Sequence, residues 1–359
     1  MQNNRAAHVV IDRDAMAHNL AQVKALTPNA RIMAVIKADA YGHNMEVAAQ
    51  ALDGADEFAV TSLDDVARLR ANGISKPLTV LSSSFDIEQL NQMSSQNVRP
   101  VIYDLAQISE LTHLSADAHL DIWLKLDTGM GRLGLCIDDA HMVAQRLLKQ
   151  NGIASVSAMT HLANADTPDH PSNQAQIKKF LKFAESYGFK QLSLMNSAGC
   201  IAFSNYAQDL VRPGIMLYGI SPQNDKSAID LNLKPAMTFK SRLISIKRLP
   251  VGSPIGYGST YALDHDSKIG VIACGYADGY PRHAPNGTPV LINGMYVPLI
   301  GRVSMDLIAV ELNDIPAKLG DEAILWGEGN PVEDLAKSCG TIAYELVCGI
   351  GARVERIVV

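Results

Sequence analysis

Residues 121–160 read DIWLKLDTGMGRLGLCIDDAHMVAQRLLKQNGIASVSAMT and decide the fold. An apolar run at 121–126 is followed by an amphipathic stretch at 137–150, the dipeptide Asn151-Gly152 and a second apolar run at 156–160. Short continuous apolar runs are typical of strands buried on both faces, and a helix-length connection between two of them indicates a parallel pair. A glycine just after the amphipathic stretch suits a helix C-cap. This stretch is therefore predicted to form a strand, a helix and a strand of one parallel sheet.

The same alternation extends from Arg31 to about Gly219, with a further amphipathic stretch at 172–187 closed by Gly188. Eight apolar runs can be counted, at 31–36, 57–61, 78–82, 98–103, 121–126, 156–160, 191–195 and 210–212. Eight strand and helix units predict an α/β fold with a (β/α)₈ barrel. A doubly wound sheet is the alternative, and the count of eight favours a closed barrel.

The pattern changes after Leu233-Lys234-Pro235. Strand-like segments follow at 238–249, 268–275, 288–300, 304–312 and 322–327, and Asn293-Gly294 is a strong hairpin signal. We expect two domains, a barrel over 1–233 and a mostly β C-terminal domain over 234–359. A leading strand at 8–11 is expected to pair with the C-terminal domain.

Composition narrows the function classes. With 47% hydrophobic and 19% charged residues, the composition is that of a globular protein. A net charge of -6 does not indicate the basic surface that binds nucleic acid. Five cysteines without paired spacing predict neither a disulfide framework nor a metal site, and they indicate a reducing compartment. No signal-peptide pattern or membrane-spanning run is recognisable, so we expect a cytoplasmic protein with no membrane partner.

The candidate chemistry lies after the predicted barrel strands, because barrel enzymes act at the carboxyl ends of their strands. Lys37 follows the first strand, where burial would lower its pKa and make it a usable base or nucleophile. A solvent-exposed lysine is the alternative. Arg132, between two glycines after the fifth strand, could bind a carboxylate. The alternative there is a plain glycine-rich turn.

Later strands end in polar groups as well. His161 and Asp166 follow the sixth strand, although a lone histidine is more often structural than catalytic. Asn196-Ser197-Ala198-Gly199 and Arg212-Pro213-Gly214-Ile215 follow the last two, where barrels commonly bind phosphate; two ordinary turns are the alternative. A Schiff-base amine, a carboxylate-binding arginine and a phosphate site together suggest pyridoxal phosphate acting on an amino acid.

At Val35-Ile36-Lys37-Ala38-Asp39-Ala40-Tyr41-Gly42-His43 the sequence resembles the cofactor-lysine signature of bacterial alanine racemases. Seven further segments resemble that family in the same order, and the resemblance covers essentially the whole chain. They are 125–134, 160–166, 196–198, 211–215, 256–261, 275–280 and 301–306. The resemblance implies a pyridoxal 5'-phosphate enzyme with a barrel and a C-terminal β domain that interconverts L- and D-alanine.

The resemblance also assigns roles. Lys37 carries the cofactor as a Schiff base and acts on one face of the substrate Cα. Tyr257, from the C-terminal domain of the partner subunit, acts on the other face, so a homodimer with shared sites is expected. His161 and Arg212 would relay protons towards Tyr257, and Arg212 would face the pyridine nitrogen, where a guanidinium keeps that nitrogen largely unprotonated. Further family positions are Tyr41, Ser197, Gly214 and Ile215 for the phosphate, Arg132 and Met305 for the substrate, and Asp166, Tyr276, Arg282 and Arg302 for the access corridor.

Ala352 departs from the family pattern, and Lys125 matches a position that the family often modifies. Many family members have a tyrosine before the arginine near the C-terminus that contacts the phosphate, whereas this chain has Ala352 before Arg353. One phosphate hydroxyl is then unaccounted for. Lys125 matches a lysine that many alanine racemases carry as a carbamate, an anion that orients the arginine at the position of Arg132. The alternative is an unmodified Lys125 paired with Asp127.

Two other functions stay open from the sequence alone. One is a broader amino-acid racemase, acting for example on serine, and the other is a non-catalytic barrel protein that binds pyridoxal phosphate. The C-terminal domain with Tyr257 argues against the second. Whether D-alanine would serve peptidoglycan synthesis or alanine catabolism is not decided by the residues.

Overall fold

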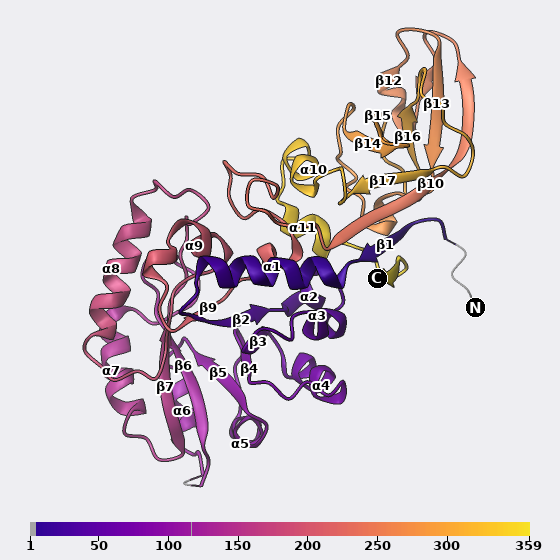
Figure 1. Ribbon diagram of the computed structural model, residues 1–359. Coiled ribbons are helices and arrows are strands. Elements are labelled where there is room, and N and C mark those ends of the chain that lie inside the picture. Colours follow the sequence, from indigo (N-terminus) through magenta and orange to yellow (C-terminus); the bar gives the residue numbers. More distant parts are fainter. Residues whose placement is uncertain (1–4, 116) are drawn as a thin grey trace.

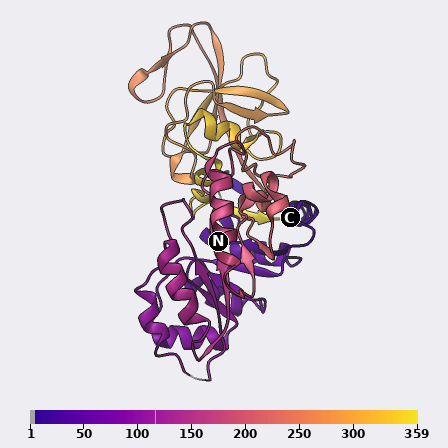
Figure 2. The same ribbon diagram turned by 90° about the vertical axis from the view of Figure 1, so that its left-hand side faces the viewer.

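The structure is a computed structural model that describes residues 5–115 and 117–359 (Figure 1). Residues 1–4 of the expected barrel segment, and residue 116, lie outside the described residues. Figure 2 shows the two parts of the chain one above the other, with the C-terminal β domain at the top. In the described residues, no helix combines the length and the apolar character needed to cross a membrane.

The N-terminal part is a nearly closed barrel of eight parallel strands, as predicted. Its strands are β2 (Arg31–Val35), β3 (Glu57–Val60), β4 (Leu78–Val80), β5 (Val98–Ile102), β6 (Leu120–Lys125), β7 (Ile153–Met159), β8 (Leu192–Ser193) and β9 (Leu210–Val211). The order of hydrogen-bonded neighbours is β8-β7-β6-β5-β4-β3-β2-β9. Between the two end strands, the backbone N–H of Arg212 donates to Met195 O at 2.8 Å. The side chains of β3, β4 and β5 are all buried, which explains their continuous apolar runs.

Helices surround this barrel (Figure 1). They are α1 (Arg13–Leu26), α2 (Lys37–Tyr41), α3 (Met45–Ala51), α4 (Leu63–Ala71), α5 (Ile87–Ser95), α6 (Gln107–Leu111), α7 (Ile137–Leu147), α8 (Ser172–Ala184) and α9 (Ser197–Ala202), with 3₁₀ turns η1 (Ser204–Tyr206) and η2 (Ile215–Tyr218). Two helices end earlier than the sequence pattern suggested. Gly152 and Gly188 are therefore not helix caps; they lie in the turns before β7 and β8, and Gly152 has a φ of +83°.

The C-terminal domain is built on one mixed sheet. Its members are β1 (His8–Ile11), β10 (Met237–Leu249), β13 (Ser267–Ile272), β14 (Pro289–Ile292), β15 (Met295–Ile300), β16 (Ile308–Glu311), β17 (Glu322–Trp326) and β18 (Glu355–Val358). The order is β13-β16-β15-β14-β17-β10-β1-β18, and β13 also pairs with β10, so six of the strands close a second small barrel. The β14–β15 turn has Asn293 and Gly294 at φ of +51° and +76°, which is the backbone that Asn-Gly favours.

The remaining elements of this domain are short. They are β11 (Pro254–Ile255), β12 (Tyr261–Ala262), the 3₁₀ turns η3 (Tyr257–Ser259) and η4 (Tyr276–Asp278), and the helices α10 (Val332–Ser338) and α11 (Ala343–Cys348). The leading strand β1 lies between β10, antiparallel, and β18, parallel. Both ends of the described chain thus belong to the C-terminal sheet.

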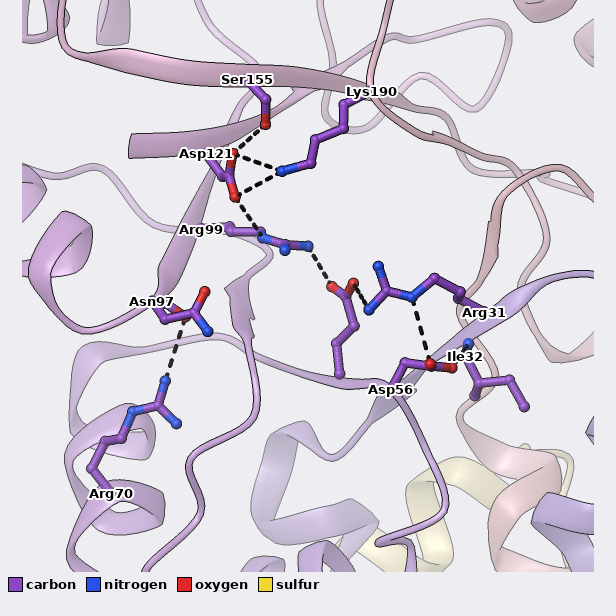
Figure 3. Close-up of polar contacts among 10 residues, drawn as sticks. Arg31, Ile32, Asp56, Arg70, Asn97, Arg99, Asp121, Ser155 and Lys190 are labelled. Atoms are coloured by element: carbon purple, nitrogen blue, oxygen red, sulfur yellow. Dashed lines mark hydrogen bonds and ion pairs between the residues drawn. The ribbon is translucent and has the colours of Figure 1, made fainter. Parts of the chain in front are cut away.

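A network of charged side chains closes the amino ends of the barrel strands (Figure 3). Glu57 is fully buried and accepts a hydrogen bond from Arg99 Nη1 at 2.8 Å, while Arg31 Nη2 lies 3.3 Å from its other oxygen. Arg99 continues the chain to Asp121, which also pairs with the half-exposed Lys190. Burial raises the pKa of Glu57 despite the two arginines. This end of the barrel is structural, and the opposite end carries the candidate site.

Candidate active site

Lys37 begins an unusual turn after β2. Ala38, Asp39 and Ala40 have φ and ψ near +50°, and Tyr41 has a φ of +54°, so the backbone makes one left-handed turn without glycine. Left-handed helix costs L-residues about 1–2 kcal/mol each. Such strain persists where the surroundings impose it, which is typical of functional sites. This turn was not predicted, because Ala38, Ala40 and Tyr41 do not favour a positive φ and Asp39 alone is a weak signal.

Two features hold the turn in place. The fully buried His43 uses Nδ1 to donate to the carbonyl oxygens of Ala40, at 3.0 Å, and Tyr41, at 2.9 Å. Helix α11 packs on the same turn, since a Cβ added to Gly42 would lie 2.1 Å from Val347 O. The C-terminal domain therefore supports the segment that carries Lys37.

Positive side chains converge at this mouth of the barrel. Burial and the charge of Arg132 lower the pKa of Lys37. The pKa of Lys125, on β6, is lowered to about 8 by burial and by the charges of Arg212, Arg132 and Lys37. Anionic ligands would stabilise this group of positive charges.

Asp127 does not neutralise Lys125. Its carboxylate accepts backbone N–H groups of Gly129, Met130 and Gly131 at 2.8–2.9 Å, and no ion pair joins Asp127 to Lys125 among the described residues. Burial opposes ionisation of Asp127, but these three donors outweigh it and lower its pKa. The aspartate shapes the loop that carries Arg132.

Arg212 and His161 lie deeper in the barrel. Arg212 is buried and donates to Ser193 Oγ and to Thr160 O, and burial lowers its pKa to about 10, so it stays charged at neutral pH. Burial and the charges of Arg212 and Lys125 put the pKa of His161 well below its ordinary value, which leaves the imidazole neutral. The bond described for His161 is with Asn196 Nδ2, at 3.4 Å, not with Arg212. Among the described residues, no hydrogen bond joins the His161 ring to Arg212.

A cradle formed by Ser197, Gly214, Ile215 and Tyr41 lies beside them. Ser197 Oγ accepts the backbone N–H of Gly214 at 2.8 Å and that of Met216 at 3.4 Å, and Ile215 opens η2. A Cβ on Gly214 would lie 2.5 Å from Tyr41 Oη, so any side chain there would have to displace the Tyr41 ring. A serine hydroxyl, a tyrosine hydroxyl and loop backbone thus meet where a phosphate was expected.

Tyr344, on α11, is a residue that sequence reasoning missed. Its ring centroid lies 6.1 Å from that of Tyr41, and burial together with the charge of Asp166 raises its pKa to about 12. Ala352, where a tyrosine was sought, is exposed. Tyr344, eight residues earlier, is thus a tyrosine near Tyr41 that the sequence analysis did not consider. The sequence signal was Tyr344-Glu345-Leu346, a short helix overlooked in a domain expected to be mostly β.

Tyr257, which is expected to serve a second subunit, and Met305, which is expected to contact the substrate, are exposed on the C-terminal domain. Tyr257, on η3, is 69% exposed, and Met305 is 53% exposed. Both ribbon views place β12, just after η3, on the far side of the C-terminal domain from the barrel. Tyr276, Arg282 and Arg302 are exposed on the same domain, whereas Asp166, on a barrel loop, accepts Asn224 Nδ2 at 3.0 Å. One chain does not bring Tyr257 to Lys37.

Comparison with known proteins gives one family. The family models described as "Alanine racemase, N-terminal domain" and "Alanine racemase, C-terminal domain" match residues 11–222 and 236–358. The chain is 42% identical to an alanine racemase of Coxiella burnetii over 361 residues, covering 99% of both, and 43% identical to one of Yersinia pestis over 352 residues, covering 98% of both.

Solved structures agree. The crystal structure of biosynthetic alanine racemase from Pseudomonas aeruginosa superposes with a TM-score of 0.95 at 40% identity, covering 99% of both chains. The alanine racemase of Acinetobacter baumannii gives 0.94 at 37% identity, covering 99% of this chain and all of that one.

Proposed function

Because the chain belongs to the alanine racemase family, we propose that it interconverts L- and D-alanine with pyridoxal 5'-phosphate and two bases, one from each subunit of a homodimer. The observation that carries the proposal is Lys37, an amine of lowered pKa, on a strained turn between a phosphate-sized cradle and a group of cations. Racemisation of alanine is an isomerase activity.

The donor set fits the cofactor. Ser197 Oγ, Tyr41 Oη and the backbone of Gly214 and Ile215 would hold the phosphate, with Tyr344 at its edge. Lys37 would hold the aldehyde carbon, and Arg212 would face the ring nitrogen. When bound, the cofactor withdraws electrons from the amino acid so that its Cα–H becomes acidic.

The chain's own groups then handle the proton and the substrate. Lys37, with its lowered pKa, has a larger neutral fraction with which to take or return the proton at one face of Cα. Arg132 and the backbone around Met305 of the partner subunit would bind the carboxylate. Arg212, still charged at neutral pH, would not release a proton to the ring nitrogen.

Tyr257 of the partner subunit would act at the opposite face. Its exposure in this chain supports a role in another subunit. His161, neutral and next to the charged Arg212, would complete a proton relay to that tyrosine once the partner is in place. Tyr276, Arg282 and Arg302 of the partner subunit and Asp166 would line the access corridor.

Lys125 is proposed as a carbamate. Its lowered pKa favours the neutral amine that reacts with carbon dioxide, and the anion formed would offset the charges of Arg132 and Arg212. The engagement of Asp127 with three backbone N–H groups supports the modification over an Asp127–Lys125 pair.

Three further proposals concern the domain division, the location of the protein and the use of D-alanine. The division into residues 1–233 and 234–359 agrees with the change from parallel to mostly antiparallel pairing. The cysteine pattern is the support for a cytoplasmic location. D-Alanine would serve peptidoglycan synthesis or alanine breakdown.

The test is to incubate purified protein and pyridoxal phosphate with L-alanine, L-serine and other L-amino acids and to follow the loss of optical rotation. We expect L-alanine to racemise fastest. Faster racemisation of serine would favour the broader racemase, and no racemisation of any substrate by cofactor-loaded protein would favour the non-catalytic barrel.

A further inference from the structure

A cavity of about 200 Å³ lies between the segment that leaves the barrel and the C-terminal domain. Its walls come from Tyr218, Ile220 and Leu233 on one side and from Trp326 and Val332 on the other. Figure 1 shows α10 and α11 next to this connecting segment. Tyr296 and Ile229, which also line the cavity, are 58% and 81% exposed, so the cavity opens to solvent. None of the proposed cofactor or substrate residues lines it.

His43 lines this cavity with an unused hydrogen-bond acceptor. Both partners of its Nδ1 are carbonyl oxygens, so Nδ1 carries the hydrogen and Nε2 has a free lone pair. Burial lowers the pKa of His43 to about 4, which keeps the ring neutral. Nε2 is buried and has no partner among the described residues. A buried acceptor left unsatisfied is unfavourable, because it has lost its hydrogen bond to water.

Glu333 supplies a second acceptor on the same lining. Its Oε1 accepts the backbone N–H of Ser221 at 2.9 Å. No side-chain cation pairs with it within the described part of the chain, and burial raises its pKa. A buried carboxyl without a cation is stabilised by any positive group that reaches it.

We propose that this cavity is a second ligand site, which takes a small apolar amine. The aliphatic and aromatic walls would bury the apolar body, and Glu333 would pair with the ammonium group. The Glu333 carboxylate would repel an anion of the same shape, and a neutral molecule would lack the ion pair with Glu333.

The position of the site gives it a connection to the turn at Lys37. The ring of His43 stacks on Tyr218 with centroids 4.6 Å apart, and Tyr218 lies 5.0 Å from Tyr41. An occupant would therefore contact the residues that support the left-handed turn. The binding proposal itself does not depend on the proposed function.

The probe for the test is N,N-dimethyl-2-phenylethylamine, a tertiary amine that keeps an ammonium N–H but cannot form a Schiff base with a cofactor. The chain has two tryptophans, so Trp123→Phe leaves Trp326, in the cavity wall, as the fluorescent reporter. We expect saturable quenching by the amine, at least about tenfold weaker binding of 2-phenylethanol, and no measurable binding of 3-phenylpropionate. Calorimetric titration of the unmodified holoenzyme repeats the measurement without the substitution.

The matched variants are Glu333→Gln and Asp334→Asn, which each remove one acid from the first turn of α10. Glutamine retains the acceptor for Ser221, so the fold is kept, and Asp334 is exposed and outside the lining. We expect Glu333→Gln to abolish the preference for amine over alcohol and Asp334→Asn to keep it. Absence of saturable amine binding to the holoenzyme, or equal amine affinity in the two variants, would overturn the proposal.

Discussion

Lys125 is the position where the structure makes the sharpest chemical prediction. With a pKa of about 8, about half of the Lys125 amine is neutral at pH 8, against about 0.3% for an ordinary lysine of pKa 10.5. The form that attacks carbon dioxide is therefore more than 100-fold enriched. Because the neutral amine is required, carbamate occupancy should rise with pH through about 8 and fall below it.

The assay is carbon NMR of the protein equilibrated with ¹³C-bicarbonate, with Lys125→Ala as the reference. A carbamate signal should appear in the parent protein and be absent from the variant. Replacing the lysine also removes the anion that orients Arg132, so the KM for L-alanine should rise about 10- to 100-fold, the scale of a charge-assisted hydrogen bond. Chloride or acetate at high concentration should restore part of the affinity. Lys179→Ala, at a lysine near Asp127 on the outer helix α8, is the control and should leave the KM unchanged.

Two results would refute this reasoning. One is density for an unbranched amine at Lys125 in protein crystallised at pH 8 with bicarbonate. The other is a Lys125→Ala enzyme with unchanged KM and no response to added anions. Either would mean that the cation group at the barrel mouth is balanced by the cofactor and substrate alone.

Three further predictions address the bases and the barrel. Tyr257→Phe should lose most racemisation and retain the cofactor, with the larger loss in hydrogen exchange from L-alanine; equal exchange from both enantiomers would contradict the assignment. Inactive Lys37→Ala and Tyr257→Phe subunits, mixed under conditions where exchange is demonstrated, should regain part of the activity, and no regain would exclude shared sites. Arg99→Met should lower the free energy of urea unfolding by up to about 3–5 kcal/mol, because the buried Glu57 then has only the more exposed Arg31 as a partner, whereas Lys190→Met, at a half-exposed residue, should cost at most about 1 kcal/mol. The Arg99→Met loss should shrink as pH falls and Glu57 takes up a proton; equal losses in the two variants would show that the buried pair is unimportant.

The barrel was predictable because parallel strands covered on both faces need apolar side chains at nearly every position. All eight runs are strands in the structure, with ends that differ by at most three residues. The Asn293-Gly294 turn was predictable for a local reason, since its two residues favour the backbone that the hairpin requires.

What could not be predicted depends on contacts between distant segments. Ala38 to Tyr41 are ordinary residues whose left-handed backbone is imposed by His43 and α11. Tyr344 joins the cradle only because the C-terminal domain folds back on the barrel. The sequence motif likewise identifies Tyr257 but does not show that this residue lies away from the barrel mouth of its own chain.

The place of β1 in the C-terminal sheet has a consequence for synthesis of the protein. This strand leaves the ribosome before its neighbours β10 and β18, the second of which comes roughly 340 residues later. At about 5–20 residues per second, β1 waits about 20–70 s for its last neighbour. During that time it exposes unpaired edges, which are prone to aggregation, while the barrel beside it can already fold. This vulnerability of β1 lasts until β18 has been synthesised and can pair with it.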